Sequence, residues 1–136
     1  MAKDFRIKGG SDVKTQLANK ESSTVIEAGD LVTMTSGYIV KAGATSAKLA
    51  YAPNGAAAGE LDVEVTIGND FTLVGTADAN FAITDKGAEV DLVGTTDLLI
   101  DLGESSIDAL IVGVGTTAGT VGSTLDVEVK INKPIF

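Results

Sequence analysis

The chain has no cysteine and no histidine, and these two absences remove most of the side chains that enzymes use for chemistry. Without cysteine there are no disulfides, no thiolate nucleophiles and no thiolate metal ligands. Without histidine the chain lacks the commonest metal ligand and the side chain most used for proton transfer near neutral pH. Tryptophan is absent and aromatic residues make up only 4%, which argues against a carbohydrate site built on ring stacking. We predict a protein that is not an enzyme and that has no catalytic residue, no metal and no cofactor.

Positive charge is scarce except near the N-terminus. The 136 residues carry a formal net charge of −9, which is the wrong sign for a nucleic-acid partner. Residues 1–20 have five basic against two acidic side chains, a net of +3, whereas residues 21–136 have five against seventeen, a net of −12. No window approaches the roughly 18 apolar residues that span a bilayer, and no apolar signal-peptide region follows the first residues. We predict synthesis in the cytoplasm and neither a nucleic-acid nor a membrane partner.

The apolar residues mostly alternate with polar ones, as they do in strands with one buried face. The clearest cases are residues 61–67 and 125–131. Further strands are expected at 24–26, 31–35, 38–41, 48–52, 71–74, 89–92, 98–102 and 109–114, between turns that contain glycine. Only one helical turn is expected, within residues 104–110. With 16 glycines, the pattern predicts an all-β domain of the small barrel or sandwich type.

A duplication is the strongest internal feature. The sequence Leu-Asp-Val-Glu-Val at 61–65 recurs at 125–129. Each copy follows a loop rich in small residues, at 53–59 and 115–122, and each loop follows an apolar strand, at 49–52 and 110–113. We therefore predict two pseudo-repeated β units, about 28–67 and 86–131, which pack together within a single β domain of residues 24–136.

Residues 1–23 stand outside the repeat and are predicted to form an extended basic N-terminal arm. Phe5 and Ile7 alternate with Arg6 and Lys8 before the pattern breaks at two glycines. Such a segment can add a strand to a partner protein. The alternative, an edge strand of the same domain, fits the pattern equally well.

The C-terminal residues end the chain on apolar side chains directly after a strand. These side chains either cover the end of their own domain or dock into a neighbouring subunit. The candidate contacts with a partner are therefore Lys3, Phe5, Arg6, Ile7, Lys8, Pro134, Ile135 and Phe136.

Two groups of acidic residues are candidate chemical sites. Asp62 with Glu64, and Asp126 with Glu128, place two carboxylates on one strand face, a geometry that suits a glycosidase pair or Ca²⁺. Because both repeats carry the pair, a solvated strand face is the simpler interpretation. A looser group, Asp97, Asp101, Glu104 and Asp108, lacks the spacing of an EF-hand loop. It leaves open a weak calcium site or an acidic inter-subunit surface.

Several segments together resemble the small β-rich head decoration (capsid cement) proteins of tailed bacteriophages. They are Gly-Asp-Leu-Val at 29–32, Gly-Tyr-Ile-Val at 37–40, the small-residue loop and alternating strand within 49–67, Phe-Ala-Ile at 81–83, Lys-Gly-Ala-Glu-Val at 86–90 and the ending at 111–129. The resemblance covers about residues 25–131 and implies a virion protein on the capsid exterior. Such a protein binds the assembled shell, as a dimer or trimer, and stabilises it by bridging copies of the major capsid (coat) protein.

Two other classes remain as alternatives. One is a tail-tube or other self-assembling virion protein, which also uses β domains with extended segments. The other is a calcium- or carbohydrate-binding β module that uses the acidic strand faces.

Overall fold

The computed structural model describes residues 4–9 and 13–136, and in these residues the chain is almost entirely β. This confirms the predicted all-β fold class. The strands of the described residues are β1 (Arg6–Gly9), β2 (Thr15–Asn19), β3 (Asp30–Thr35), β4 (Tyr38–Lys41), β5 (Ala50–Ala52), β6 (Asp62–Thr66), β7 (Thr72–Gly75), β8 (Glu89–Val93), β9 (Leu99–Asp101), β10 (Leu110–Val112) and β11 (Val127–Ile131). One turn of 3₁₀ helix, η1 (Ile83–Asp85), lies between β7 and β8. No helix in the described ranges is long and apolar enough to cross a bilayer.

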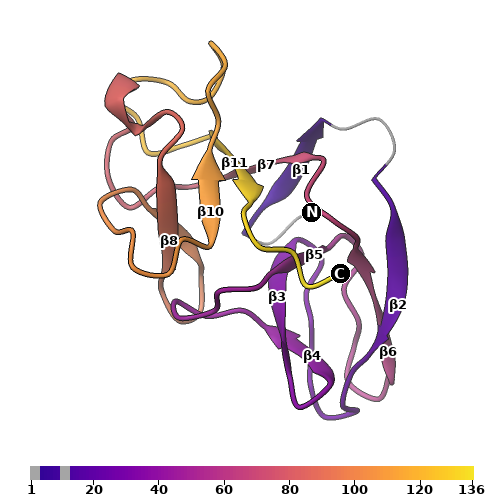
Figure 1. Cartoon of the computed structure of the whole chain (residues 1–136). Helices are drawn as coiled ribbons and strands as arrows, with labels where there is room; N and C mark the ends of the chain where they lie inside the picture. The colour runs from indigo at the N-terminus through magenta and orange to yellow at the C-terminus, as the bar shows by residue number, and fades with distance from the viewer. Residues whose placement is uncertain (1–3, 10–12) are drawn as a thin grey trace.

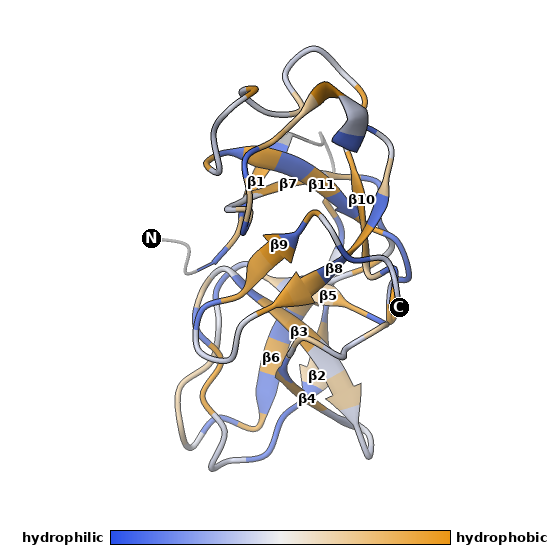
Figure 2. Cartoon of the chain, turned by 90° about the vertical axis from the view of Figure 1, so that its left-hand side faces the viewer, coloured by the Kyte–Doolittle hydropathy of each residue, from blue (hydrophilic) through white to orange (hydrophobic). Residues whose placement is uncertain are grey.

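The strands form three antiparallel sheets with the orders β1-β7-β11-β10-β8-β9, β2-β6 and β4-β3-β5. Figures 1 and 2 show them as two lobes, a lower lobe of β2 to β6 and an upper lobe of β1 and β7 to β11. Among the described residues the sheets do not close into one barrel, which corrects that part of the prediction. The nearest approach to closure is an isolated bridge between Ala77 and Ile100, which places β9 beside the chain that follows β7.

The two lobes have the same strand order. In the lower lobe β5 lies beside β6, where the main-chain N–H of Tyr51 donates to Thr66 Oγ1 at 2.9 Å. In space the lower lobe therefore runs β2-β6 and then β5-β3-β4, as two sheets placed side by side. The upper lobe runs β7-β11-β10-β8-β9 as one sheet, with β1 added beyond β7. Each strand of the lower lobe has its counterpart five strands later in the chain.

Two turns show the same correspondence in detail. Gly29 and Gly87 both have positive φ, +92° and +77°, a conformation that glycine adopts without strain. The N–H of Gly29 donates to the carbonyl of Ala52 at 2.8 Å, and that of Gly87 to the carbonyl of Val112 at 3.0 Å. These hydrogen bonds make Ala52 equivalent to Val112. The alignment of the apolar strands 49–52 and 110–113 instead matches Ala52 with Gly113, one residue later in the chain. The correspondence supports the predicted pseudo-repeat, while an origin by duplication stays a prediction.

The apolar side chains form two clusters that share the strands β3 and β5. Leu31 and Tyr51 belong to the larger cluster, which fills the upper lobe, whereas Val32 and Ala50 belong to the smaller cluster of the lower lobe. Because successive residues of a strand point to opposite faces, β3 and β5 are buried on both sides. The two lobes therefore share a wall, which joins them into one domain.

The described part of the N-terminal segment belongs to this domain. β1 pairs with β7, and β2 pairs with β6. Phe5 is buried, its N–H donates to the carbonyl of Gly29 at 3.2 Å, and its carbonyl accepts from the hydroxyl of Tyr51 at 3.0 Å. The edge-strand alternative is thus the one observed, which corrects the expectation of a separate arm: the apolar side chains of the segment complete the domain's own core. Lys3 lies outside the described residues.

The C-terminal residues cover the lower lobe. The N–H of Leu49 donates to the carbonyl of Lys133 at 2.9 Å, and the N–H of Ile135 donates to the carbonyl of Leu49 at 3.0 Å, with Pro134 beside Leu49 in a parallel bridge. The side chains of Ile135 and Phe136 pack against the smaller apolar cluster. These contacts lie within the chain, in agreement with the first of the two alternatives for this end.

Candidate functional site

A groove on the outer face of the upper sheet brings together three features of the sequence. The strand register places Arg6 opposite Val74, and Val74 opposite Glu128. Together with the loop that follows β10, these strands enclose an open hollow of about 400 Å³. Its lining combines the basic N-terminal segment (residues 1–20, below called the leader), the second acidic pair and the glycine-rich loop at 113–122. The lining residues are Arg6, Lys8, Val74, Thr116, Thr117, Gly119, Thr120, Asp126 and Glu128.

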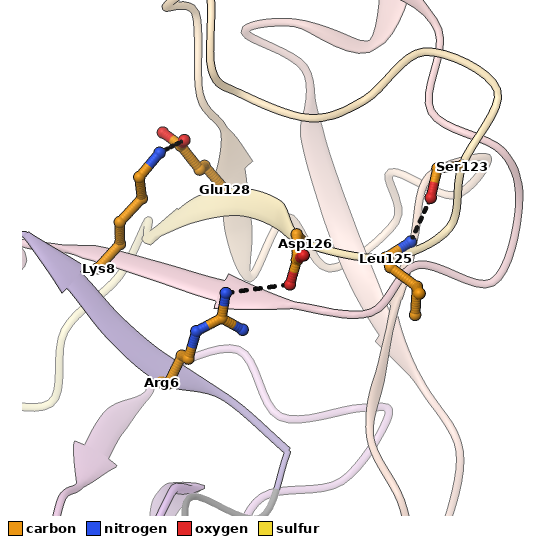
Figure 3. A network of polar contacts seen from close by, with 6 residues as sticks. All are labelled: Arg6, Lys8, Ser123, Leu125, Asp126 and Glu128. Carbon is orange, nitrogen blue, oxygen red and sulfur yellow. Dashed lines mark hydrogen bonds and ion pairs between the residues drawn. The ribbon is translucent and has the colours of Figure 1, made fainter.

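Ion pairs cross the groove from β1 to the chain at β11 (Figure 3). Arg6 Nη2 lies 3.0 Å from Asp126 Oδ1, and Lys8 Nζ contacts the carboxylate of Glu128. Arg6 and Lys8 are two residues apart in the strand, so their side chains leave the same face of the sheet and both reach the acidic pair. Exposed pairs of this kind contribute about 0–1 kcal/mol each. Their main consequence is that Asp126 and Glu128 are paired carboxylates, which weakens the interpretation as a catalytic pair or a calcium site.

A second hollow of about 360 Å³ continues the groove across β11 to β10. The two hollows share Glu128, and the second is also lined by Thr72, Ile111, Val112, Gly113, Val114, Gly115, Val129 and Lys130. This surface offers ion pairs, hydroxyl groups and valine side chains in one open channel.

The first acidic pair has different surroundings in the lower lobe. Glu64 accepts from the hydroxyl of Thr15 at 2.6 Å and from the side-chain amide of Asn54. Asp62 is exposed to solvent. Within the described ranges, no basic side chain forms an ion pair with either carboxylate.

The acidic loop at 103–109 is organised by a residue that the sequence did not single out. The buried carboxylate of Asp91 accepts the N–H groups of Ser106, Ile107 and Asp108 at 3.1, 2.9 and 2.8 Å. The structure has no helical turn within 104–110, so that prediction is wrong. The side chain of Asp91 fixes the loop by accepting these three N–H groups, and the chain then runs directly into β10.

The candidate calcium ligands of the same region do not converge. Burial, together with the neighbouring carboxylate of Asp78, raises the pKa of Asp101. Among the described residues, no group of three or more acidic side chains is placed to hold a metal ion. Asp108 instead accepts from the hydroxyl of Ser105 at 2.7 Å.

A buried charge cluster joins the leader to the lower lobe. Lys41 Nζ lies 3.1 Å from Asp4 Oδ2 and 3.4 Å from Asp30 Oδ1, and donates to the carbonyl of Thr96 at 2.8 Å. Burial raises the pKa of Asp30, against the opposing effects of the Glu27 N–H and of Lys41. No spacing in the sequence indicates this cluster, because its members come from four separate segments.

The predicted contact residues thus separate into two places. Arg6 and Lys8 line the groove, Phe5 and Ile7 pack into the core beneath it, and Pro134, Ile135 and Phe136 lie on the lower lobe. Comparison with protein-family models, with curated proteins and with solved structures found no match.

Proposed function

We propose that this chain is a structural protein of a tailed-phage virion, which binds the outer surface of the assembled capsid and stabilises it by bridging coat subunits. The resemblance of residues 25–131 to head decoration proteins supports this function. The main structural observation in support of this function is a set of solvent-exposed apolar side chains at equivalent positions of the two lobes.

These positions follow from the repeat. Val25 and Ile83 each stand two residues before the equivalent turns at Glu27 and Asp85. Leu61 and Leu125 hold the first position of the repeated motif. All four side chains are exposed to solvent, with exposed fractions of 54% for Val25 and 62% for Ile83, and of 64% for Leu61 and 59% for Leu125.

Bare apolar side chains at matched positions suit a partner that is itself repeated. A single exposed apolar side chain is common on protein surfaces, so what marks these side chains as a contact surface is their recurrence at the same positions of both lobes. A capsid presents many identical coat subunits, so one lobe can contact one subunit while the other lobe contacts its neighbour. Linking two weak contacts in one chain raises the overall affinity well above that of either contact.

The stabilisation then follows from mass action. A protein that binds only the assembled shell lowers the free energy of that state at every site it occupies. Assembly of the chain into a dimer or trimer around a symmetry axis would let one particle hold several coat subunits. No covalent chemistry is required.

Co-sedimentation with shells of the coat protein of the phage that encodes the chain tests the proposal. The wild-type chain should sediment with assembled shells, leave free coat subunits in the supernatant and raise the temperature at which shells break open. The double variants Val25→Ser/Leu61→Ser and Ile83→Ser/Leu125→Ser each remove one lobe's apolar pair, and each should lose most of the stabilisation. Val121→Ser, an exposed valine of the loop after β10, is the matched control and should behave as the wild type.

Two results would contradict the proposal. Equal binding to free subunits and to shells would remove the basis for stabilisation. Rings or tubes formed by the chain alone would favour a self-assembling tail component.

A further inference from the structure

Among the described residues, β2 forms a strand pair along one edge and its other edge is free of a paired strand, although β4 lies nearby. β2 is the outermost strand of the lower lobe in Figure 1, and within the described ranges its only strand partner is β6. The N–H of Ile67 donates to the carbonyl of Lys14, and the N–H of Lys20 to the carbonyl of Leu61, both at 2.8 Å. Hydrogen-bonded pairs alternate along an antiparallel ladder, so every second residue from Lys14 to Lys20 bonds to the chain at β6. The residues in the alternate positions, Thr15, Leu17 and Asn19, turn their main-chain N–H and C=O groups away from β6.

The equivalent strand of the upper lobe has this edge occupied. Leu17 is opposite Glu64 in the pair β2 and β6, and Val74 is opposite Glu128 in the pair β7 and β11. Leu17 and Val74 are therefore equivalent residues. Beyond Val74 the sheet continues with Arg6 of β1. Val74 is only 3% exposed as a result, whereas Leu17 is 70% exposed.

The charges repeat the same contrast. In the upper lobe, Arg6 and Lys8 of the edge strand pair with Asp126 and Glu128. The equivalent carboxylates of the lower lobe, Asp62 and Glu64, have no basic partner among the described residues. The lower lobe thus has the unpaired edge of β2, the apolar side chain of Leu17 and the acidic pair. Within the described ranges it has no counterpart of β1, the basic strand that covers the equivalent features of the upper lobe.

We propose that the free edge of β2 binds an extended basic strand of another protein, antiparallel to β2, in the way that β1 lies on β7. The strand carries arginine or lysine at alternate positions, one of them above Leu17 and directed at Asp62. Main-chain hydrogen bonds to Thr15 and Leu17 provide affinity, and the side-chain positions provide specificity, as in other complexes formed by strand addition.

A second copy of this chain cannot supply the strand throughout an assembly. Each chain has two such edges, at β2 and β7, but only one leader of the required chemistry. If the leader of one copy bound to β2 of another copy, it would leave the β7 edge of its own chain uncovered. The strand must therefore come from a different protein, and its identification as the coat protein rests on the proposed function.

The first test uses a synthetic peptide with the sequence of residues 4–9, Asp-Phe-Arg-Ile-Lys-Gly, blocked at both ends. Added to the ¹⁵N-labelled full chain, it should shift the amide signals of Thr15, Leu17 and Asn19 and those of residues 61–64. A peptide with glutamate in place of its arginine and lysine should not shift them. Shifts confined to the upper-lobe groove, or none at all, would overturn the proposal.

Substitution of Leu17 separates the strand edge from the side chain. Leu17→Pro removes the outward N–H, and proline is tolerated on a strand edge where that group faces solvent. Leu17→Thr removes the apolar side chain but keeps the N–H. We expect the proline variant to bind the peptide at least about tenfold more weakly than the threonine variant, with both melting as cooperatively as the wild type. Equal peptide binding by the two folded variants would contradict strand addition.

Binding to coat-protein shells provides the second readout. Leu17→Pro should also bind shells more weakly than Leu17→Thr. If the peptide binds at β2 but the wild-type chain does not bind shells, the edge site stands and the proposed function fails. If the wild-type chain and both variants bind shells equally well, the coat protein is excluded as the source of the strand.

Discussion

The ring of Phe5 lies directly against the main chain of Gly75. A methyl group in place of the glycine hydrogen would come within 2.4 Å of Phe5 Cε2. Phe5 comes immediately before β1, and Gly75 is the last residue of β7. The close approach of ring and backbone therefore fastens the leader to the upper sheet, in addition to the hydrogen bonds of the two strands.

Gly75→Ala should destabilise the chain and weaken the attachment of β1, because the added methyl group forces the ring to move. Phe5→Ala should cost about 3–5 kcal/mol of unfolding free energy through the cavity it leaves. In the double variant the added methyl group meets no ring. The double variant should therefore lose less unfolding free energy than the two single variants lose when their losses are added. Urea unfolding of the four proteins measures this coupling, and strict additivity would contradict the contact.

Lys41→Met should destabilise the chain by about 3 kcal/mol at neutral pH, because it leaves the carboxylates of Asp4 and Asp30 buried without their cation. Lys48→Met, at an exposed lysine of the same lobe, is the control and should change little.

The same substitution should change the pH dependence of stability. Burial raises the pKa of Asp30, so the native state binds this proton more tightly than the unfolded state does, and stability falls as pH rises through the raised pKa. The charge of Lys41 lowers the pKa of Asp30 and so opposes the effect of burial. Removal of Lys41 should therefore raise this pKa further. The gap in melting temperature between wild type and Lys41→Met should therefore widen from pH 4 to pH 7; a gap that narrows would contradict this account.

Lys20→Met should destabilise the lower lobe. Lys20 is only 1% exposed, and its Nζ donates to the carbonyls of Glu21 and Thr24. Methionine fills a similar volume but removes the donor to the Thr24 carbonyl, at a cost of about 1–3 kcal/mol. The Glu21 carbonyl keeps the N–H of Thr24 as a donor at 3.1 Å. Thermal unfolding measures the loss, and the exposed Lys14→Met is the control. A variant as stable as the wild type would show that the Thr24 carbonyl does not depend on Lys20 for a hydrogen bond.

Asp91→Ala should release the loop at 103–109. Three main-chain N–H groups lose their acceptor, so the amides of Ser106, Ile107 and Asp108 should exchange with solvent faster. Loss of these charge-assisted hydrogen bonds should also cost about 2–4 kcal/mol in total. Hydrogen exchange followed by mass spectrometry measures the local effect, with the exposed Asp70→Ala as control. Unchanged exchange in the loop would mean that its shape does not depend on Asp91.

Most strands could be predicted from alternation alone. The pattern at 61–67 became β6 and that at 125–131 became β11, since one face of each is buried. The strand expected at 24–26 is reduced to a single bridge between Ile26 and Ala56. β2 was missed because exposed Gln16 and Leu17 stand together and the buried Lys20 looks polar, so its apolar face does not alternate in the sequence.

The candidate groove could be predicted only in parts. The basic leader, the second acidic pair and the glycine-rich loop were each visible, but nothing in their spacing placed them together. Their convergence depends on the pairing of β7 with both β1 and β11. Such long-range pairing is decided by the whole core and not by any local segment.

By itself, the sequence determined the all-β class, the repeated motif and the poverty of catalytic side chains, because alternation and composition are local properties. Only the tertiary structure decided that the described part of the basic leader lies on its own domain and that Arg6 and Lys8 neutralise the second acidic pair. It also decided that the first acidic pair has no basic partner in residues 4–9 and 13–136. The physical reason is that a strand exposes polar side chains on one face whatever its neighbours, whereas its edges are satisfied or left free by chain segments far away in sequence. The same Leu-Asp-Val-Glu-Val motif therefore lies in a covered sheet at β11 and one strand from a free edge at β6.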